Sequence, residues 1–256
     1  MSNSYFYVPE PGNEPVLSYA PGSRERTQLE AELERLIANP VEIPLVIGGE
    51  DVRTGNLATV TAPHDHSLEL GRYHQAGPEE VDRAIRAALN ARAQWAALPW
   101  EQRVSIFLRA AELLAGPWRA TLNAATMLGQ GKTVHQAEID SACELIDFLR
   151  FNAYYLTQIM ADQPASSAGV WNRVEYRPLE GFIFAVTPFN FTSIAGNLPT
   201  APALVGNVVV WKPASSAVLS AYYFMRLLQA AGGPAGVIHF LPGSGRTLAN
   251  PVIASP

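Results

Sequence analysis

The sequence contains a single cysteine, Cys143, among 256 residues. It therefore has no disulfide framework and no cysteine cluster that could bind a metal. No apolar run reaches the roughly 18 to 20 residues that a membrane helix requires, and the first twenty residues contain no Lys or Arg of the kind found in leader peptides. We therefore expect a reducing compartment: the cytoplasm, or the mitochondrial matrix if the protein is eukaryotic and processed.

The sequence also lacks any block of like charges, and its formal net charge is only −5. A partner such as nucleic acid or an acidic membrane surface normally requires a basic face, so neither is expected. The charged residues are unevenly distributed, because only Glu180, Lys212, Arg226 and Arg246 lie within residues 179–256. A stretch with so little charge is expected to be mostly buried.

The first part of the chain is predicted to be mainly helical. Residues 1–60 are expected to form an N-terminal arm, with a short helix near 24–37 and a hairpin within 43–55 that turns at Gly48-Gly49. Helices are predicted from Pro78, from the residue after Pro99, and from Trp118 to about Gly129. The first of these is expected to place Val81, Ile85, Leu89 (with Ala88) and Trp95 toward a core. A Thr133–Gln136 capping box opens the longest helix, which is predicted to run to about Ala161.

The rest of the chain reads as β-structure with crossover helices. Residues 163–178 alternate polar and apolar side chains, which predicts an exposed strand ending at Pro178. GFIFAVT, NVVVW and VIHFL then predict three parallel strands joined by helices, with both edges of the sheet open. The predicted fold class is α/β: a helical N-terminal part followed by the first strands of an incomplete Rossmann-type parallel sheet.

Polar residues follow each of these three predicted strands. Thr187-Pro-Phe-Asn190 follows the first, Lys212 ends the second, and Pro242-Gly-Ser-Gly245 follows the third. Singly, each is weak evidence, because turn asparagines, strand-end lysines and glycine-rich turns are usually structural or solvated. Ligands bind parallel sheets beyond the carboxyl ends of the strands, where all three groups would meet. Together they predict a cofactor site.

Two of these stretches carry a resemblance to a known family. TPFNF, followed by WKPA with its lysine 22 residues after Asn190, resembles the aldehyde dehydrogenase superfamily. GQGKTVHQAEIDSACELIDFLRFNA and GNLPTAPALVGNVVVWKP are similar to the family that oxidises L-glutamate γ-semialdehyde, the open form of 1-pyrroline-5-carboxylate, in proline degradation. The resemblance covers the N-terminal portion of that family. It implies an incomplete NAD-binding domain at 61–162 and 179–256, a dimerisation strand at 163–178 that forms a homo-oligomer, and a catalytic domain absent from this chain.

The resemblance assigns roles to individual residues. Asn190 matches the asparagine whose amide stabilises the oxyanion during attack on an aldehyde, and we expect its phenylalanine neighbours to pack and hold it in place. Thr187 and Gly245 match positions that line the cofactor NAD, and Lys212 matches the lysine that binds its adenosine ribose. Ser215 stands where many relatives have Glu, which would repel the 2′-phosphate of NADP. We therefore expect this chain to discriminate against NADP less sharply than relatives that have Glu at this position.

Other candidate residues remain open or unsuitable. Glu144 falls where this family has a glutamate near the substrate entrance, but a solvated helix carboxylate is equally compatible with the sequence. Cys143 is expected to be a buried apolar residue, because no base or helix N-terminus lies near it in the sequence. His64 and His66 could form half of a metal site, but no third ligand is indicated, so no metal is expected.

The family's nucleophilic cysteine and general base lie beyond residue 256. We therefore expect this 256-residue chain, as a truncated N-terminal half, to be inactive alone. Two alternatives remain. One is a non-catalytic NAD-binding or dimerisation module, and the other is a dehydrogenase of another semialdehyde.

Overall fold

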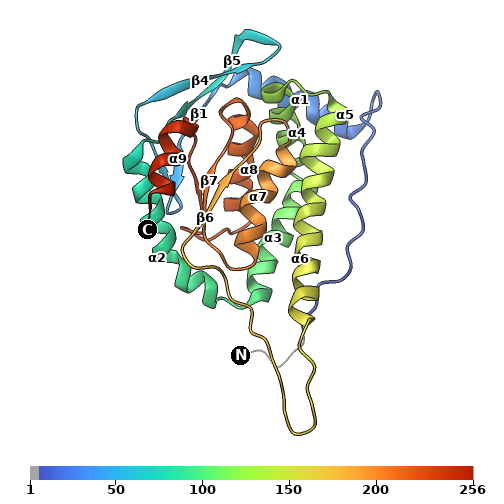
Figure 1. Ribbon diagram of the computed structural model, residues 1–256. Helices are drawn as coiled ribbons and strands as arrows, with labels where there is room; N and C mark the ends of the chain where they lie inside the picture. The colour runs from blue at the N-terminus through green and yellow to red at the C-terminus, as the bar shows by residue number, and fades with distance from the viewer. Residues whose placement is uncertain (1–5, 256) are drawn as a thin grey trace.

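A five-stranded sheet forms the centre of the protein, in a computed structural model that describes residues 6–255 (Figure 1). Its strand order is β3-β2-β8-β7-β6. The three predicted strands are present as β6 (Ile183–Val186), β7 (Val209–Lys212) and β8 (Ile238–Phe240), and they are parallel. The predicted α/β class is therefore confirmed.

The expectation that both edges of this sheet are open is wrong. The hairpin predicted in the N-terminal segment forms β2 (Leu45–Ile47) and β3 (Glu50–Val52), with Gly48 and Gly49 at positive φ in its turn. Strand β2 pairs antiparallel with β8 through Val46 and Phe240. The hairpin therefore covers the β8 edge, while β6 remains the outer strand among the described residues.

A second, three-stranded sheet has the order β1-β5-β4. It consists of β1 (Val41–Ile43), β4 (Leu57–Ala62) and the ten-residue β5 (Asp65–His74). Gly71 on β5 lies against β1, and a Cβ at this position would come within 2.2 Å of the Val41 carbonyl oxygen. Only glycine allows these two strands to approach so closely.

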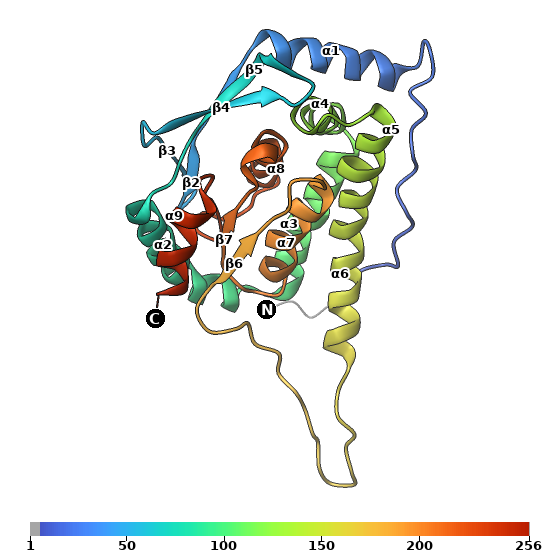
Figure 2. The ribbon, with the colours of Figure 1, turned by 45° about the horizontal axis from the view of Figure 1, so that its top comes forward.

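Helices cover both faces of the five-stranded sheet (Figure 2). Helices α2 and α9 lie on one face, and α7 and α8 lie on the other, with α3, α4 and α6 beyond them. Their bounds are α1 Arg24–Ala38, α2 Pro78–Ala97, α3 Trp100–Ala115, α4 Arg119–Gln130, α5 Val134–Ala137, α6 Leu145–Ala161, α7 Thr192–Leu204, α8 Val218–Ala230 and α9 Gly245–Ile253, with a 3₁₀ turn at Ser215–Ala217.

The predicted helices are present, with two differences. Leu89 on α2 is 43% exposed, because Ile85 and Ala88 occupy the buried side of that turn. The predicted long helix starts with the Thr133–Gln136 capping box, but Glu138–Glu144 forms a π-helical segment between α5 and α6. Such segments often occur at functional sites. No helix of residues 6–255 has both the length and the apolar character needed to cross a membrane.

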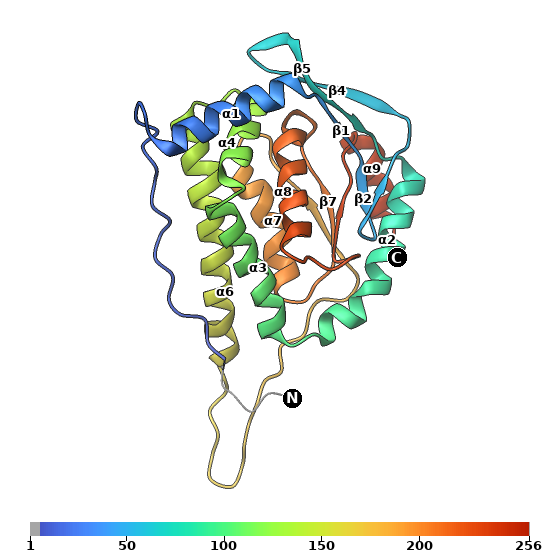
Figure 3. The ribbon, with the colours of Figure 1, turned by 180° about the vertical axis from the view of Figure 1, so that it is seen from behind.

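The N-terminal segment runs along α6 and is held by buried charges (Figure 3). Arg119 binds Glu138 and Glu14, each at 2.5 Å, and Glu14 also binds Arg150 at 2.6 Å. Tyr19 donates its hydroxyl hydrogen to Glu138 at 2.7 Å. Burial opposes ionisation of Glu138, but the donors around it hold the pKa of its carboxyl below the usual range. The segment is therefore fixed to the helices by a paired buried carboxylate.

Residues 163–178 do not form the predicted strand within this chain. They extend away from the body of the protein as a long loop with one isolated bridge, between Ser167 and Val170 (Figure 1). A strand needs a neighbour to satisfy its N–H and C=O groups, and none of residues 6–255 pairs with this segment beyond that bridge. The polar–apolar alternation is therefore present without a partner strand in the described part of the chain.

His239 connects β8 to the hairpin and predicts a pH-dependent stability. Its ring is buried, and it accepts the Gly48 N–H at Nδ1 (3.2 Å) while Nε2 lies 3.0 Å from the Gly236 carbonyl oxygen. Burial lowers the pKa of His239 to about 4 from an ordinary value of 6.5. The unfolded chain therefore takes up a proton as the pH falls below 6.5 while the folded chain does not. Stability should fall between pH 6.5 and 4, by up to about 3 kcal/mol.

Urea unfolding of wild type and His239→Gln across this pH range tests the prediction. Glutamine retains a donor and an acceptor but cannot ionise, so the variant should show a flatter pH dependence. His66→Gln, at an exposed position of β5, controls for the loss of a histidine. An unchanged slope in His239→Gln would contradict the prediction.

Candidate active site

The carboxyl ends of β6, β7 and β8 form one rim, as the sequence predicts. Val186 pairs with Lys212, and Trp211 pairs with Phe240, so the three strands end at nearly the same level. Just past β6, the Thr187 N–H donates to the Lys212 carbonyl oxygen at 3.2 Å. The groups after the first and second strands are therefore directly hydrogen-bonded.

Trp211 fixes Thr187 at this rim. The indole is fully buried and packs edge-on against Phe240, with ring centroids 5.1 Å apart, and against Phe224 at 6.4 Å. Its Nε1–H donates to the Thr187 hydroxyl oxygen at 3.0 Å. A hydroxyl that accepts one hydrogen bond can still donate another. Thr187 is therefore buried and oriented, with its hydroxyl proton available to a neighbour.

The structure brings Lys212, Ser215 and Gly245 around the same rim. Lys212 is half-buried, and burial lowers the pKa of its ammonium group. Ser215 donates its hydroxyl hydrogen to the Gly243 carbonyl oxygen at 3.4 Å, which joins the second and third groups. Gly245 starts α9 in open space, with no atom within 4 Å of a Cβ built there. Free N–H groups at such a helix start favour an anionic ligand.

The loop carrying Asn190 is not held as the sequence suggested. Asn190 is exposed, and so are Phe189 (66%) and Phe191 (40%), so the expected packing of the phenylalanines is wrong. The loop is held at its ends instead. Thr187 is fixed by Trp211 and β7, and α7 begins immediately after Phe191.

The start of α7 is held by Asp140, which the sequence analysis did not identify. Asp140 lies on the π-helical segment and is only 3% exposed. Its carboxylate accepts the backbone N–H groups of Thr192 (3.0 Å) and Ser193 (2.9 Å), and it forms an ion pair with Lys132 at 2.5 Å. One signal was available in the sequence: the chain contains two lysines, Lys132 and Lys212.

Glu144 contacts the same helix start. Its Oε2 accepts the Ser193 hydroxyl hydrogen at 2.8 Å, and the residue is half-buried. It lines a cavity of about 760 Å³ together with Phe148, Tyr155 and Phe191. Of the two interpretations of the sequence, a freely solvated carboxylate does not describe this environment. The geometry is that of a carboxylate in a cavity wall beside the Asn190 loop.

Cys143 has the buried, unreactive environment that the sequence predicts. Burial, with the Glu138 carboxylate nearby, raises the pKa of its thiol to about 12. A thiol with such a pKa carries almost no thiolate at neutral pH and is a poor nucleophile. His64 and His66 are exposed, and no three His, Cys, Asp or Glu residues of the described chain are placed to hold a metal ion.

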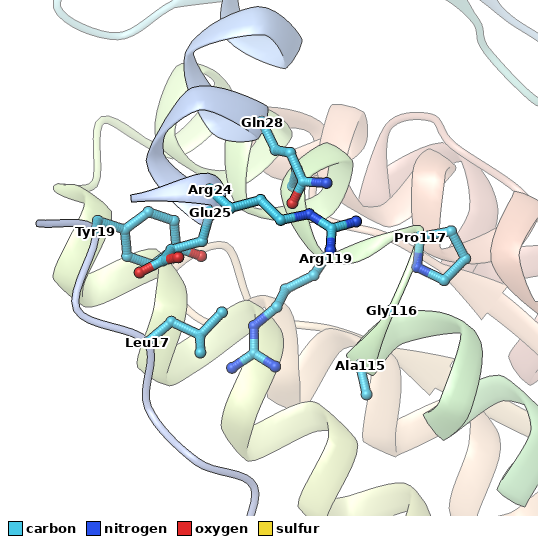
Figure 4. A pocket seen from close by; sticks show the side chains of 10 residues that line it. Leu17, Tyr19, Arg24, Glu25, Gln28, Ala115, Gly116, Pro117 and Arg119 are labelled. Carbon is cyan, nitrogen blue, oxygen red and sulfur yellow. The ribbon is translucent and has the colours of Figure 1, made fainter. Parts of the chain in front are cut away.

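Another cavity, of about 590 Å³, lies where α1 begins beside the turn between α3 and α4 (Figure 4). Arg24, Glu25 and Gln28 of α1 face Arg119 and Pro117 across it. Arg119 is already paired with Glu14 and Glu138. None of the rim residues lines this cavity, so it is separate from the candidate active site.

Solved structures with this arrangement are known. A delta-pyrroline-5-carboxylate dehydrogenase from Mycobacterium tuberculosis, solved also with bound NAD, matches all of this chain and 48% of its own chain, with a TM-score of 0.98 and 52% identity. A 1-pyrroline-5-carboxylate dehydrogenase from Thermus with bound NAD matches 95% of this chain and 47% of its own, with a TM-score of 0.87 and 30% identity.

Curated relatives agree with these structures. A delta-1-pyrroline-5-carboxylate dehydrogenase of Agaricus bisporus is 52% identical over 98% of this chain and 46% of its own length. The mitochondrial delta-1-pyrroline-5-carboxylate dehydrogenase of Mus musculus is 46% identical over 95% of this chain and 43% of its own length. The chain thus spans a little under half the length of the relatives it matches.

The comparison with family sequence patterns covers most of the chain, including the whole rim. The pattern described as "Aldehyde dehydrogenase family" matches residues 52–256, a stretch that starts at the last residue of β3 and contains every helix from α2 onward and the three parallel strands. Strand ends that carry Thr187, Asn190 and Lys212 are therefore part of the matched region. On this evidence the chain belongs to the aldehyde dehydrogenase family.

Proposed function

We propose that these residues serve an NAD-dependent enzyme that oxidises L-glutamate γ-semialdehyde, formed from 1-pyrroline-5-carboxylate, to L-glutamate in proline degradation. We place it in a reducing compartment, either the cytoplasm or the mitochondrial matrix. One observation carries the proposal: all of this chain matches 48% of the Mycobacterium tuberculosis enzyme, at 52% identity. The rim with Thr187, Lys212 and Asn190 supports it independently, because its geometry suits a dinucleotide beside a reacting carbonyl group.

The rim residues fit NAD in charge and space. Burial lowers the pKa of Lys212, and no carboxylate among the described residues acts on that pKa in the opposite direction. Its ammonium group is therefore suited to hydrogen bonding with neutral partners such as ribose hydroxyls. The open space at Gly245 and the free N–H groups at the start of α9 suit a diphosphate. When bound there, NAD supplies the acceptor for a hydride.

Asn190 has the main catalytic role among these residues. By the family resemblance, a thiolate adds to the aldehyde, and the Asn190 amide donates a hydrogen bond to the oxygen as negative charge develops on it. An amide serves here because a carboxylate would repel that charge. The thiolate and the base that activates water are assigned, by the same resemblance, to residues outside 1–256. Cys143 is too deeply buried to act as the thiolate.

Replacing Asn190 should reduce turnover without weakening cofactor binding. In the full-length polypeptide that carries these residues, Asn190→Ala should lower kcat by about 10²- to 10³-fold, because an oxyanion donor is lost. Asn190→Asp, which has the same shape, should lose at least as much, since it adds repulsion. Steady-state NADH formation from 1-pyrroline-5-carboxylate measures kcat, and fluorescence titration measures the Kd for NAD.

Two controls accompany this measurement. Asn90→Ala, on the exposed face of α2, should retain wild-type kcat. Residues 1–256 alone should form no NADH, because their single cysteine, Cys143, is buried. If the wild-type protein binds NAD but oxidises no aldehyde, the non-catalytic binding module becomes the better proposal. Faster oxidation of a different semialdehyde would instead replace the substrate.

Ser215 sets the cofactor preference in this proposal. It is exposed beside Gly243, three residues after Lys212, and it carries no charge to repel a 2′-phosphate. Ser215→Glu should raise the ratio of Kd for NADP to Kd for NAD by about tenfold or more, because the carboxylate would lie close to that phosphate. Ser216→Glu places the same charge on the next exposed residue and should change the ratio less. A wild-type protein that already excludes NADP would contradict the proposal.

We also propose that residues 163–178 mediate association with a second copy of the protein. The loop extends from the body and exposes Trp171 (81%), Val170, Val174 and Tyr176, a cluster that is costly to leave in water. Trp171→Ser should weaken self-association by about tenfold or more, because large aromatics dominate interface energies. Sedimentation velocity over a concentration series measures this. Ile37→Ser, another exposed apolar side chain on α1, should have no effect. A monomeric wild-type protein would contradict the proposal.

A further inference from the structure

Helix α7 lacks a capping side chain of its own. Its N-cap residue, Phe191, makes no side-chain cap, and the first N–H groups of a helix need partners from elsewhere. Asp140, 52 residues earlier in the chain, supplies them, because one carboxylate oxygen accepts the Thr192 N–H and the other accepts the Ser193 N–H. A carboxylate from another helix thus takes the place of the usual N-cap.

Lys132 completes this arrangement. Its ammonium group lies 2.5 Å from Asp140 Oδ2 and 4.6 Å from the centre of the Phe191 ring. A cation at the face of an aromatic ring is attracted to it. Lys132 therefore neutralises the buried carboxylate and contacts the residue that directly follows Asn190. Residues 191–193 are held through the ring of Phe191 and two backbone N–H groups.

The opposite end of the Asn190 loop is held separately. Thr187 is fixed by hydrogen bonds to Trp211 and to the β7 backbone. Between these two anchors, Phe189 and Asn190 are exposed and Pro188 is only partly covered. The direction of the Asn190 amide therefore depends on where the two ends of a short loop are held. Of these ends, the one at α7 lies nearer to Asn190 in the chain.

We propose that Asp140, with Lys132, is a positioning residue for the oxyanion donor: it holds the start of α7 so that the Asn190 amide points at the reacting oxygen. Asp140 touches neither substrate nor cofactor in this proposal and acts through Asn190. The proposal rests on the proposed function for its catalytic part, because an oxyanion donor matters only if an aldehyde is oxidised. Its structural part, the hold on the loop, can be measured without activity.

The test is a double-mutant cycle in the full-length polypeptide. Asp140→Asn keeps the shape but puts an NH₂ group where one of the three donors now points, so at least one hydrogen bond is lost. Alone, it should lower kcat by about tenfold or more, with the KM for NAD changed less than about threefold. In an Asn190→Ala background it should cost less than about twofold, because the donor it positions is gone. The same fold-decrease in kcat in both backgrounds would overturn the proposal.

Hydrogen–deuterium exchange gives the readout that does not need turnover. The backbone amides of residues 189–193 should exchange faster in Asp140→Asn than in wild type, while those of β7 should not change. Asp82→Asn is the matched control, since Asp82 forms an exposed pair with Arg86 on α2. Unchanged exchange at residues 189–193 would overturn the proposal even if kcat falls.

If Asp140→Asn does not fold, Lys132→Gln replaces it, because it removes the charge partner and the ring contact but leaves the carboxylate to accept both N–H groups. It should lower kcat less than Asp140→Asn, with the same non-additivity toward Asn190→Ala. If wild type oxidises no aldehyde, the proposed function fails, and the exchange measurement alone decides whether Asp140 holds the loop.

Discussion

The burial of β7 is the constraint on which the rest of the arrangement depends. Val208 to Trp211 are fully buried, with parallel neighbours on both sides and helices over both faces. A strand in this position can present polar groups only at its ends. Because β6 and β8 run parallel to β7, the polar residues that follow all three strands lie at one rim. Lys212, at the end of the buried strand β7, is half-buried there as a consequence.

Two buried carboxylates then fix the N-terminal segment and the start of α7. Glu138 and Asp140 lie two residues apart on the π-helical segment and serve different partners: Glu138 binds the N-terminal segment, and Asp140 binds α7. A buried ion is costly unless it is fully paired, and both meet this condition, with an Arg or Lys and at least two further donors each. We interpret the contacts of Glu138 and Asp140 as fixing the positions of the N-terminal segment and of α7, rather than as large contributions to the free energy of folding.

The sequence predicted what depends on local pattern. The helices and parallel strands were recognisable because each buries a face of fixed period, and the rim followed from strand direction. The errors concern contacts between distant segments. Pairing of Val46 with Phe240 closed a sheet edge expected to be open. Residues 163–178 have the alternation of a strand but no partner strand within residues 6–255. Leu89 has helical spacing, yet Ala88 takes the buried position.

Asp140 and the two phenylalanines show the same limit at the site itself. Aromatic residues on both sides of Asn190 suggested a loop fixed by packing, but an exposed loop can be fixed equally well at its ends. Asp140 looked like any helix carboxylate, because its role exists only across the 52 residues that separate it from Thr192. The scarcity of lysine was the one local signal for the site. The chain contains two lysines, and one lies beside the Asn190 loop while the other lies at the rim.

An oxyanion donor has to be oriented and has to be shielded from water, and the exposure of Asn190 shows that these two requirements can be met by different parts of a protein. A fixed dipole lowers a barrier when it is already oriented and when water is excluded, because water would screen it and compete for the same oxygen. Residues 6–255 hold both ends of the Asn190 loop, through Trp211 at one end and Asp140 at the other, and in our proposal this provides the orientation. They do not provide exclusion, since Phe189 and Phe191 are themselves exposed. In the role proposed for Asn190, its full effect therefore depends on what covers these two rings during the reaction, whereas we infer that the direction of its amide is set by this part of the chain.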